Sequence, residues 1–149
     1  MKIAVASDHG GFNLKNKIKS NLLSEGYEIT DFGTDSLDSC DYPDFALPAA
    51  EAVAFGKCDR AIIVCSTGIG VSIVANKVPG IRCALCHDKY GAEFTRRHND
   101  ANVLAMGGKA VGEGLALEIV EIFLKTEFEG GRHQRRVDKI TAVEKKYSK

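Results

Sequence analysis

The stretch from Arg60 to Gly70 reads RAIIVCSTGIG, an apolar run that ends in a glycine-rich turn. A short, continuous apolar run bounded by a turn is typical of a strand that is buried on both faces. Because Val71–Asn76 then continues with helical character, this stretch predicts a strand, a turn and a helix in succession.

The same order recurs on both sides of this stretch. Further strands are expected at Lys2–Ser7, Tyr27–Phe32, Ile81–Cys86 and Asn102–Met106, and helices at Asn13–Glu25, Phe45–Phe55, Lys89–Arg97 and Glu113–Phe128. Alternating strands and helices predict a parallel sheet with helices on both faces. The expected fold is therefore a three-layer α/β/α sandwich, Rossmann-like, with about five parallel strands. An extra C-terminal helix from about Gln134 to Tyr147 is expected to pack on the body or on a second subunit.

Length and composition indicate an ordinary globular protein. With 149 residues, 44% hydrophobic and 27% charged, residues 1–149 are expected to form a single domain with a packed core. No apolar run is long enough to cross a membrane, and the N-terminus lacks a signal-peptide core, so a cytoplasmic location is expected. Five cysteines are an odd number, and without export a disulfide framework is not expected.

The charge is zero overall but unevenly distributed. The segment from Arg132 to Lys149 contains seven basic residues against Asp138 and Glu144, a surplus of five positive charges. Such a segment indicates an anionic partner: a phosphorylated small molecule, nucleic acid or an acidic neighbouring subunit. Nucleic acid is disfavoured because aromatic residues are only 7% of the chain and form no stacking ladder.

Ligands of parallel α/β sheets bind at the carboxyl ends of the strands. That rule points to Ser7–Gly11, Cys65–Gly70, His87–Asp88 and Gly107–Lys109. In the second of these segments a thiol precedes a turn whose free N–H groups favour negative charge, and the same field favours the thiolate form of Cys65.

Four interpretations of the Cys65 turn compete. A buried strand cysteine before a tight turn is the simplest. A dinucleotide site requires a third glycine where Ile73 stands, and a cysteine phosphatase requires an arginine near Val71. The fourth makes Cys65 a base that removes a proton next to a carbonyl, while the N–H groups and the Thr67 hydroxyl hold the developing enediolate.

Histidines and arginines supply the other candidates. His9 follows Asp8 at the ligand edge, whereas His98 ends a helix and could act as a proton-transfer group or only as a C-terminal cation. His87 and His133 are expected to be solvated or to face an anion. Arg132 and Arg136 have the i, i+4 spacing that presents two guanidinium groups to one phosphate, although a solvated helix face has the same pattern.

No metal site is expected. Cys83-x-x-Cys86 lacks a second pair and lies in a predicted strand, where the two side chains point to opposite faces. Both are therefore expected to be core cysteines. Tyr42, which precedes Pro43, is expected either to project into the cleft or to pack.

Several motifs together resemble those of ribose-5-phosphate isomerase type B, a family that includes galactose-6-phosphate isomerase subunits. They are Ser7–Gly11, Asp41–Pro43, Cys65–Gly70, Ala75–Lys77, His98–Asn102 and Gly130–Arg136. The resemblance runs from end to end. It implies a Rossmann-like enzyme without metal or cofactor that forms homodimers or homotetramers, with clefts shared between subunits.

The resemblance also implies roles for single residues. Cys65 would be the base, Thr67 and the Gly68–Val71 amides would stabilise the enediolate, and His98 would open the furanose ring. Phosphate would be held by His9, Arg132 and Arg136. The other expected substrate-binding residues are Asp8, Tyr42, Ser66, Gly68, Ile69, Gly70, Val71, Asn99 and Lys109.

Two positions depart from the family pattern. Ser66 stands where the family usually has glycine. Lys109 stands where the family usually has arginine, so a single ammonium group replaces a planar guanidinium that can form two parallel hydrogen bonds. The expected activity is reversible isomerisation of ribose 5-phosphate and ribulose 5-phosphate through a cis-enediolate. The alternatives are a hexose 6-phosphate isomerase, acting on allose or galactose 6-phosphate, and a sugar-phosphate binding module without turnover.

Overall fold

Five parallel strands form one sheet in the order β2-β1-β3-β5-β4, as the computed structural model, which describes residues 1–149, shows. The strands are β1 (Lys2–Ser7), β2 (Glu28–Asp31), β3 (Arg60–Cys65), β4 (Cys83–Leu85) and β5 (Val103–Gly107). The expected parallel sheet and its number of strands are confirmed.

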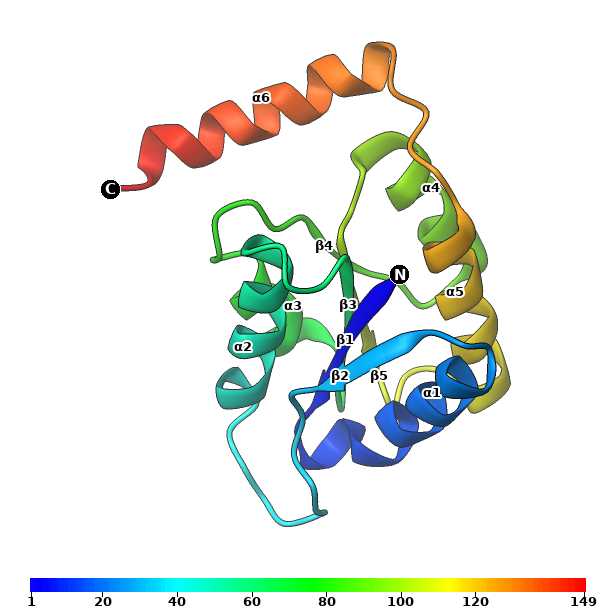
Figure 1. Ribbon diagram of the computed structural model, residues 1–149. Coiled ribbons are helices and arrows are strands. Elements are labelled where there is room, and N and C mark those ends of the chain that lie inside the picture. Colours follow the sequence, from blue (N-terminus) through cyan, green and yellow to red (C-terminus); the bar gives the residue numbers. More distant parts are fainter.

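Helices cover both faces of this sheet. They are α1 (Phe12–Ser24), α2 (Pro43–Ala54), α3 (Ile69–Ala75), α4 (Lys89–Asn99) and α5 (Glu113–Lys125), and a short 3-10 turn, η1 (His9–Gly11), precedes α1. Figure 1 shows α2 and α3 on one side of the strands and α1, α4 and α5 on the other. The three-layer α/β/α sandwich is thus confirmed.

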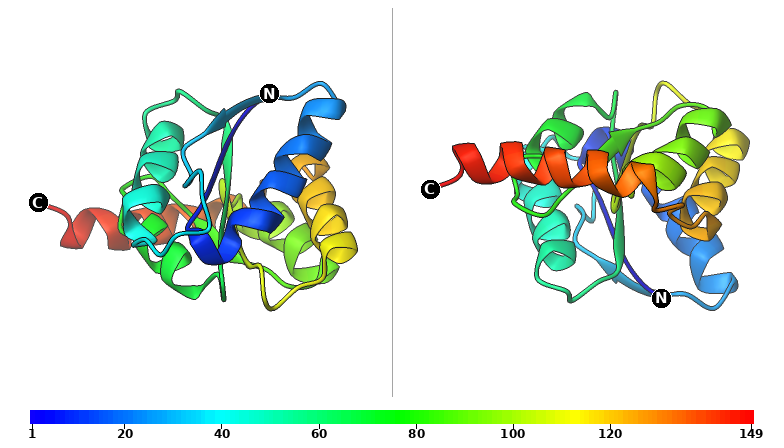
Figure 2. Two further views of the ribbon diagram at one scale, coloured as in Figure 1. Left: turned by 90° about the horizontal axis from the view of Figure 1, so that it is seen from below. Right: turned by 90° about the horizontal axis from the view of Figure 1, so that it is seen from above.

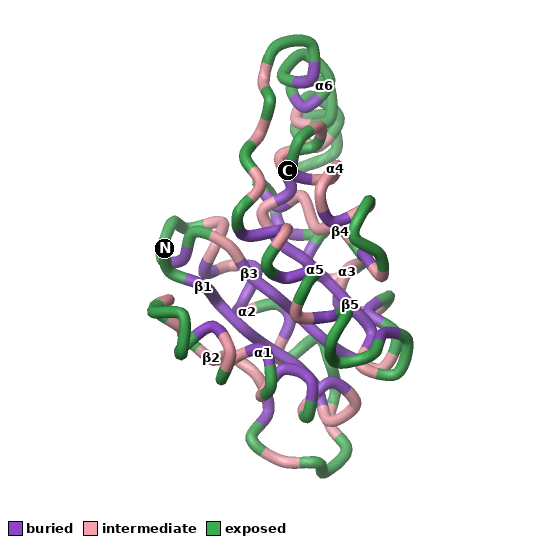
Figure 3. Tube along the Cα trace, turned by 90° about the vertical axis from the view of Figure 1, so that its right-hand side faces the viewer, coloured by how far each residue is buried: buried purple, intermediate pink, exposed green.

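The core consists of two apolar clusters separated by the sheet. In β1, Ile3 and Val5 belong to the cluster under α1 and α5, whereas Ala4 and Ala6 belong to the cluster under α2 and α3. Successive side chains of a strand point to opposite faces, so a strand between two helix layers must be apolar throughout. Figure 3 shows β1, β3 and β5 as the buried centre of the molecule.

The chain reverses its direction of travel across the sheet between β1 and β3. From β1 it moves outward to β2 on one side, and from β3 it moves to β5 and β4 on the other. The carboxyl ends of β1 and β3 therefore form the topological switch point of the sheet, which is where open α/β sheets bind their ligands.

Helix α6 (Arg132–Tyr147) stands apart from the layers. Figures 1 and 2 show it crossing the amino ends of the strands and projecting beyond the body. Its first half packs on α4 through His133 and Val137, while Ile140, Val143 and Tyr147 are exposed. No helix has the length and apolar character that crossing a membrane requires.

Some element boundaries differ from the predicted ones. Strand β4 covers only Cys83–Leu85, because asparagine side chains occupy the backbone groups next to its start: Asn102 accepts from the Arg82 N–H, and Asn76 accepts from the Cys83 N–H. Helix α5 ends at Lys125, three residues before the predicted end, and α6 begins at Arg132, where Gly131 has a φ of 56°.

Candidate active site

Cys65 is the last residue of β3 and lies at this switch point. Its side chain is buried, and the Gly68 N–H donates to its Sγ at 3.1 Å. An N–H group that points at sulfur stabilises the negative charge of a thiolate. A cysteine that acts as a base needs such a donor, whereas a cysteine that only packs in a strand does not. The contact therefore favours the interpretation of Cys65 as a base.

The turn after Cys65 exposes unused hydrogen-bond donors. Gly68 has a φ of 78°, which opens α3 with a tight left-handed turn. The N–H groups of Gly70 and Val71, in the first turn of α3, have no acceptor in the chain, and the Ile69 N–H donates to the Thr67 Oγ1 at 3.2 Å. Free amides at a helix N-terminus can hold an anionic oxygen.

The loop after β1 lies directly against this turn. Gly10 approaches Ser66 so closely that an added Cβ would collide with the Ser66 Oγ. Asp8, which is buried, accepts the Gly11 N–H through Oδ1 at 3.1 Å, and no hydrogen bond occupies its second oxygen. The structure therefore brings a carboxylate oxygen next to the Cys65 turn, as the strand-edge rule predicted.

His9 is held by the loop before α2. The Cys40 N–H donates to its Nδ1 at 3.2 Å. A neutral imidazole that accepts at Nδ1 carries its proton on Nε2, so Nε2 can donate to an oxygen of a ligand. The same loop brings the Tyr42 ring against Gly70, where an added Cβ would lie 2.6 Å from a ring carbon. Tyr42 thus packs beside the Cys65 turn.

The loop after β5 closes the other side of the site. The Gly108 N–H donates to the Cys65 carbonyl at 2.7 Å and the Lys109 N–H to the Ser66 carbonyl at 3.1 Å, which fixes Lys109 beside the turn. His87 accepts the Gly107 N–H at Nε2, 2.9 Å away. His87 is half-buried just after β4, and this contact links it to the end of β5.

The remaining predicted site residues lie at the opposite edge of the sheet. Strands β3 and β5 are paired so that Cys65 lies opposite Gly107 at one end and Ala61 lies opposite Val103 at the other. His98 lies five residues before Val103 in the chain. At about 3.3 Å per residue, β5 separates the two ends by about 13 Å. His98 and Asn99 end α4, and Arg132 and Arg136 are exposed on the first turns of α6, on that far side.

The expectation that His133 is solvated is wrong. His133 is buried, and its ring stacks on His98 with centroids 4.0 Å apart. Burial lowers the pKa of His133, and the neighbouring His98 and Arg132 lower it further. The buried position of His133 was not foreseen, although Val137, four residues later, is apolar and defines the same face of α6.

The other cysteines do not belong to the Cys65 site. Cys83 packs against the cluster under α3 and Cys86 belongs to the opposite cluster, so their side chains point to opposite faces as predicted. Burial raises the pKa of Cys83 to about 12 and that of Cys86 to about 11. Both thiols therefore stay protonated near neutral pH.

Fold and site together define an α/β protein whose thiol, free amides and carboxylate meet at a topological switch point. The family model for Ribose/Galactose Isomerase matches residues 3–140. The chain belongs to this family.

Similar proteins cover nearly the whole chain. The structure of ribose-5-phosphate isomerase B from Clostridium thermocellum is 59% identical, with a TM-score of 0.98 over 99% of this chain and 100% of that one. Ribose-5-phosphate isomerase B from Escherichia coli is 49% identical over 97% of each chain. The Mycoplasma genitalium enzyme, solved with bound ribulose 5-phosphate, is 42% identical, with a TM-score of 0.92 over 97% of this chain and 96% of that one.

Proposed function

We propose that this protein is an aldose–ketose isomerase that interconverts ribose 5-phosphate and ribulose 5-phosphate. The observation that carries the proposal is the Cys65 Sγ beside the Gly68 N–H, with the free amides of Gly70 and Val71 next to it. Nearly full-length similarity to enzymes of that name supports the choice of substrate.

Cys65 is the base in this proposal. Its thiolate removes the proton from C2 of the open-chain aldose, while the electron pair moves toward the C1 oxygen and gives a cis-enediolate. The amides of Gly70 and Val71 and the Thr67 hydroxyl stabilise the enediolate oxygens. The O2 hydroxyl proton then moves to O1, and return of the proton from the Cys65 thiol to C1 gives the ketose. The transfer involves a proton alone and requires no metal or cofactor.

The sugar is bound from two sides of the thiol. The free Oδ2 of Asp8 accepts from sugar hydroxyls, and the Nε2–H of His9 donates to the phosphate. Ser66, Ile69, Tyr42 and Lys109 complete the binding shell. A remote phosphate anchor supplies binding energy that fixes the reacting carbons against Cys65.

Ring opening requires a second copy of the chain. His98, Asn99, Arg132 and Arg136 lie about 13 Å or more from Cys65, too far to act on the same pentose within one chain. We therefore propose a homodimer, or a tetramer built from such dimers, in which these residues of one copy complete the Cys65 cleft of the other. The exposed Ile140, Val143 and Tyr147 of α6 provide apolar surface for that contact.

Solvent deuterium separates turnover from binding. In D₂O, each true substrate acquires deuterium at C1 or C2, detected by NMR or mass spectrometry, because the thiol exchanges its proton with solvent. A binding module without turnover gives no incorporation and would refute the proposal. Comparing kcat/KM for ribose 5-phosphate, allose 6-phosphate and galactose 6-phosphate tests the substrate: a preference for either hexose would overturn the pentose assignment.

A further inference from the structure

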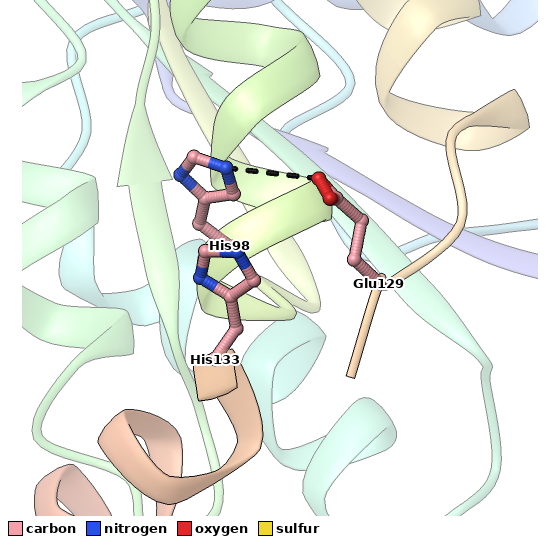
Figure 4. A group of neighbouring side chains, drawn as sticks. All are labelled: His98, Glu129 and His133. Atoms are coloured by element: carbon pink, nitrogen blue, oxygen red, sulfur yellow. Dashed lines mark ion pairs between the residues drawn. The ribbon is translucent and has the colours of Figure 1, made fainter. Parts of the chain in front are cut away.

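Three side chains that could bind a metal ion meet where α4 faces the start of α6. They are His98 near the end of α4, Glu129 in the connection before α6, and His133 in its first turn. Their ligand atoms all lie within 4.8 Å of one another. Figure 4 shows the Glu129 carboxylate directed at His98, with His133 beside it.

The backbone holds this cluster together. The Glu129 N–H donates to the Arg97 carbonyl at 3.1 Å, which fixes Glu129 next to α4. The Glu129 Oε1 lies 3.7 Å from the His98 Nε2. The three ligands are therefore already assembled from two helices and the segment that joins them.

The donor set and spacing suit zinc. Two imidazoles and one carboxylate are a common three-ligand set for Zn²⁺, with a fourth position open to water. Metal–ligand bonds of about 2.0–2.2 Å place tetrahedral ligand atoms about 3.4 Å apart. The His98–Glu129 separation of 3.7 Å is near that value, and the exposed Glu129 side chain is free to adjust.

One rearrangement must accompany binding. The His98 and His133 rings are stacked with only 10° between their planes, whereas a bound ion lies in the plane of each ring that ligates it. The rings must therefore tilt apart. His98, whose side chain is 37% exposed, has room to rotate, while His133 is buried and stays in place.

Charges of both signs lie next to the cluster. Arg132, which precedes His133 in the chain, repels a cation, and the Glu129 carboxylate offsets that repulsion.

We propose that His98, Glu129 and His133 form a binding site for Zn²⁺, and that the bound ion inhibits the isomerase reversibly. Inhibition follows because the ion occupies the ring nitrogen of His98, which then cannot exchange a proton with the sugar ring. The inhibitory part rests on the proposed function, whereas the binding part does not. The ion is thus an inhibitor and takes no part in isomerisation.

Zinc binding is tested by calorimetry on the full-length, chelator-treated protein titrated with ZnCl₂. Wild type is expected to bind one ion per chain with micromolar affinity. Glu129→Gln should weaken binding about 10- to 100-fold, and His133→Asn should do the same. Glu127→Gln is the matched control, since it removes an exposed carboxylate two residues away. Equal affinity in wild type, Glu129→Gln and His133→Asn would overturn the site.

Cobalt distinguishes this site from the cysteines. Co²⁺ bound to nitrogen and oxygen ligands shows only weak visible bands, whereas a thiolate ligand adds an intense near-ultraviolet charge-transfer band. We expect weak bands alone, and these should be lost in Glu129→Gln. An intense band would place the ion on a cysteine and refute the proposal.

Inhibition is measured with ribose 5-phosphate in the same proteins. Zinc should inhibit wild type and Glu127→Gln at concentrations near the Kd measured by calorimetry, and EDTA should restore their activity. Half-inhibition of Glu129→Gln should require a zinc concentration at least about 10-fold higher. Stoichiometric binding without inhibition would refute the inhibitory part. A chain that binds zinc as described but never turns over sugar phosphate would instead refute the proposed function and leave the zinc site standing.

Discussion

Cys65 and His98 lie at opposite edges of the same sheet. Cys65 ends β3, in register with the last residue of β5, whereas His98 lies five residues before β5 begins. The proposed reaction requires both side chains at one sugar, and about 13 Å of strand separates their levels. A cleft made by two copies reconciles the two positions, because each copy then contributes the edge that the other lacks.

Mixing two inactive variants should restore activity. Cys65→Ala and His98→Asn each remove one half of every cleft, but a mixed dimer contains one cleft with both defects and one intact cleft. After equal amounts exchange subunits at random, about a quarter of wild-type activity is expected. Activity is followed with ribose 5-phosphate before and after exchange. Mixtures that stay inactive, although mass spectrometry shows mixed dimers, would contradict the shared cleft.

Cys65→Ala should abolish turnover and spare binding. General base catalysis contributes about 10²- to 10⁴-fold, so kcat should fall by at least that much. The affinity for ribose 5-phosphate, measured by calorimetry, should stay within a few-fold, because Asp8, His9 and the amides remain. Cys58→Ala, a buried thiol before the amino end of β3, is the control and should retain kcat. A Cys65→Ala protein with near-normal turnover would exclude the thiol as base.

The three layers and the loops at the carboxyl ends of the strands could be predicted because local patterns determine them. Continuous apolar runs such as Arg60–Cys65 are buried on both faces, and the carboxyl ends of parallel strands must share one edge. The convergence of the loops at Gly10, Ser66 and Lys109 follows from that rule alone. It required no knowledge of side-chain contacts.

The sequence could not reveal which candidates stay apart. The resemblance groups His98 and Arg132 with Cys65 in clefts shared between subunits, but it does not show that the end of α4 and the start of α6 both lie at the amino ends of the strands. The contacts of His87 and His133 could not be predicted, because a lone histidine carries no periodic signal. Only tertiary contacts, with Gly107 for one and with His98 for the other, determine their roles.

Arg136→Ala should chiefly weaken substrate binding. A guanidinium group that contacts only phosphate stabilises ground state and transition state alike, so KM should rise about 10-fold or more while kcat changes less. Arg136→Lys retains the charge but loses the two parallel hydrogen bonds of a guanidinium group, so its KM should lie between those of wild type and Arg136→Ala. Lys146→Ala removes the same charge from the last turn of α6 and should leave KM unchanged. A normal KM in Arg136→Ala would remove this residue from the phosphate site.

Gly68→Ala should destabilise the protein more than Gly80→Ala does. Both glycines have left-handed φ values, 78° and 86°, so an L side chain at either costs about 1–2 kcal/mol. At Gly80 the added Cβ meets open space, whereas at Gly68 it lies 2.7 Å from the Met106 carbonyl carbon. The difference between the two free energies of unfolding, measured in urea, isolates this close approach. Equal losses would show that the turn can shift to make room.

The lowered pKa of His133 makes stability depend on pH. Burial, followed by the charges of His98 and Arg132, holds the pKa of folded His133 below the unfolded value of about 6.5. Between those two values the unfolded chain binds more protons, so the free energy of unfolding rises with pH. The stability associated with a neutral His133 is therefore complete above about pH 6.5 and declines as the pH falls below it.

His133→Gln removes this titration. The free energy of unfolding of wild type minus that of the variant should therefore shrink as the pH falls from about 7 to about 5. Urea unfolding at one fixed protein concentration measures both proteins, and the subtraction cancels the other histidines. A difference that stays constant over this range would mean that His133 titrates alike in the folded and unfolded states, and that its burial against α4 does not persist in solution.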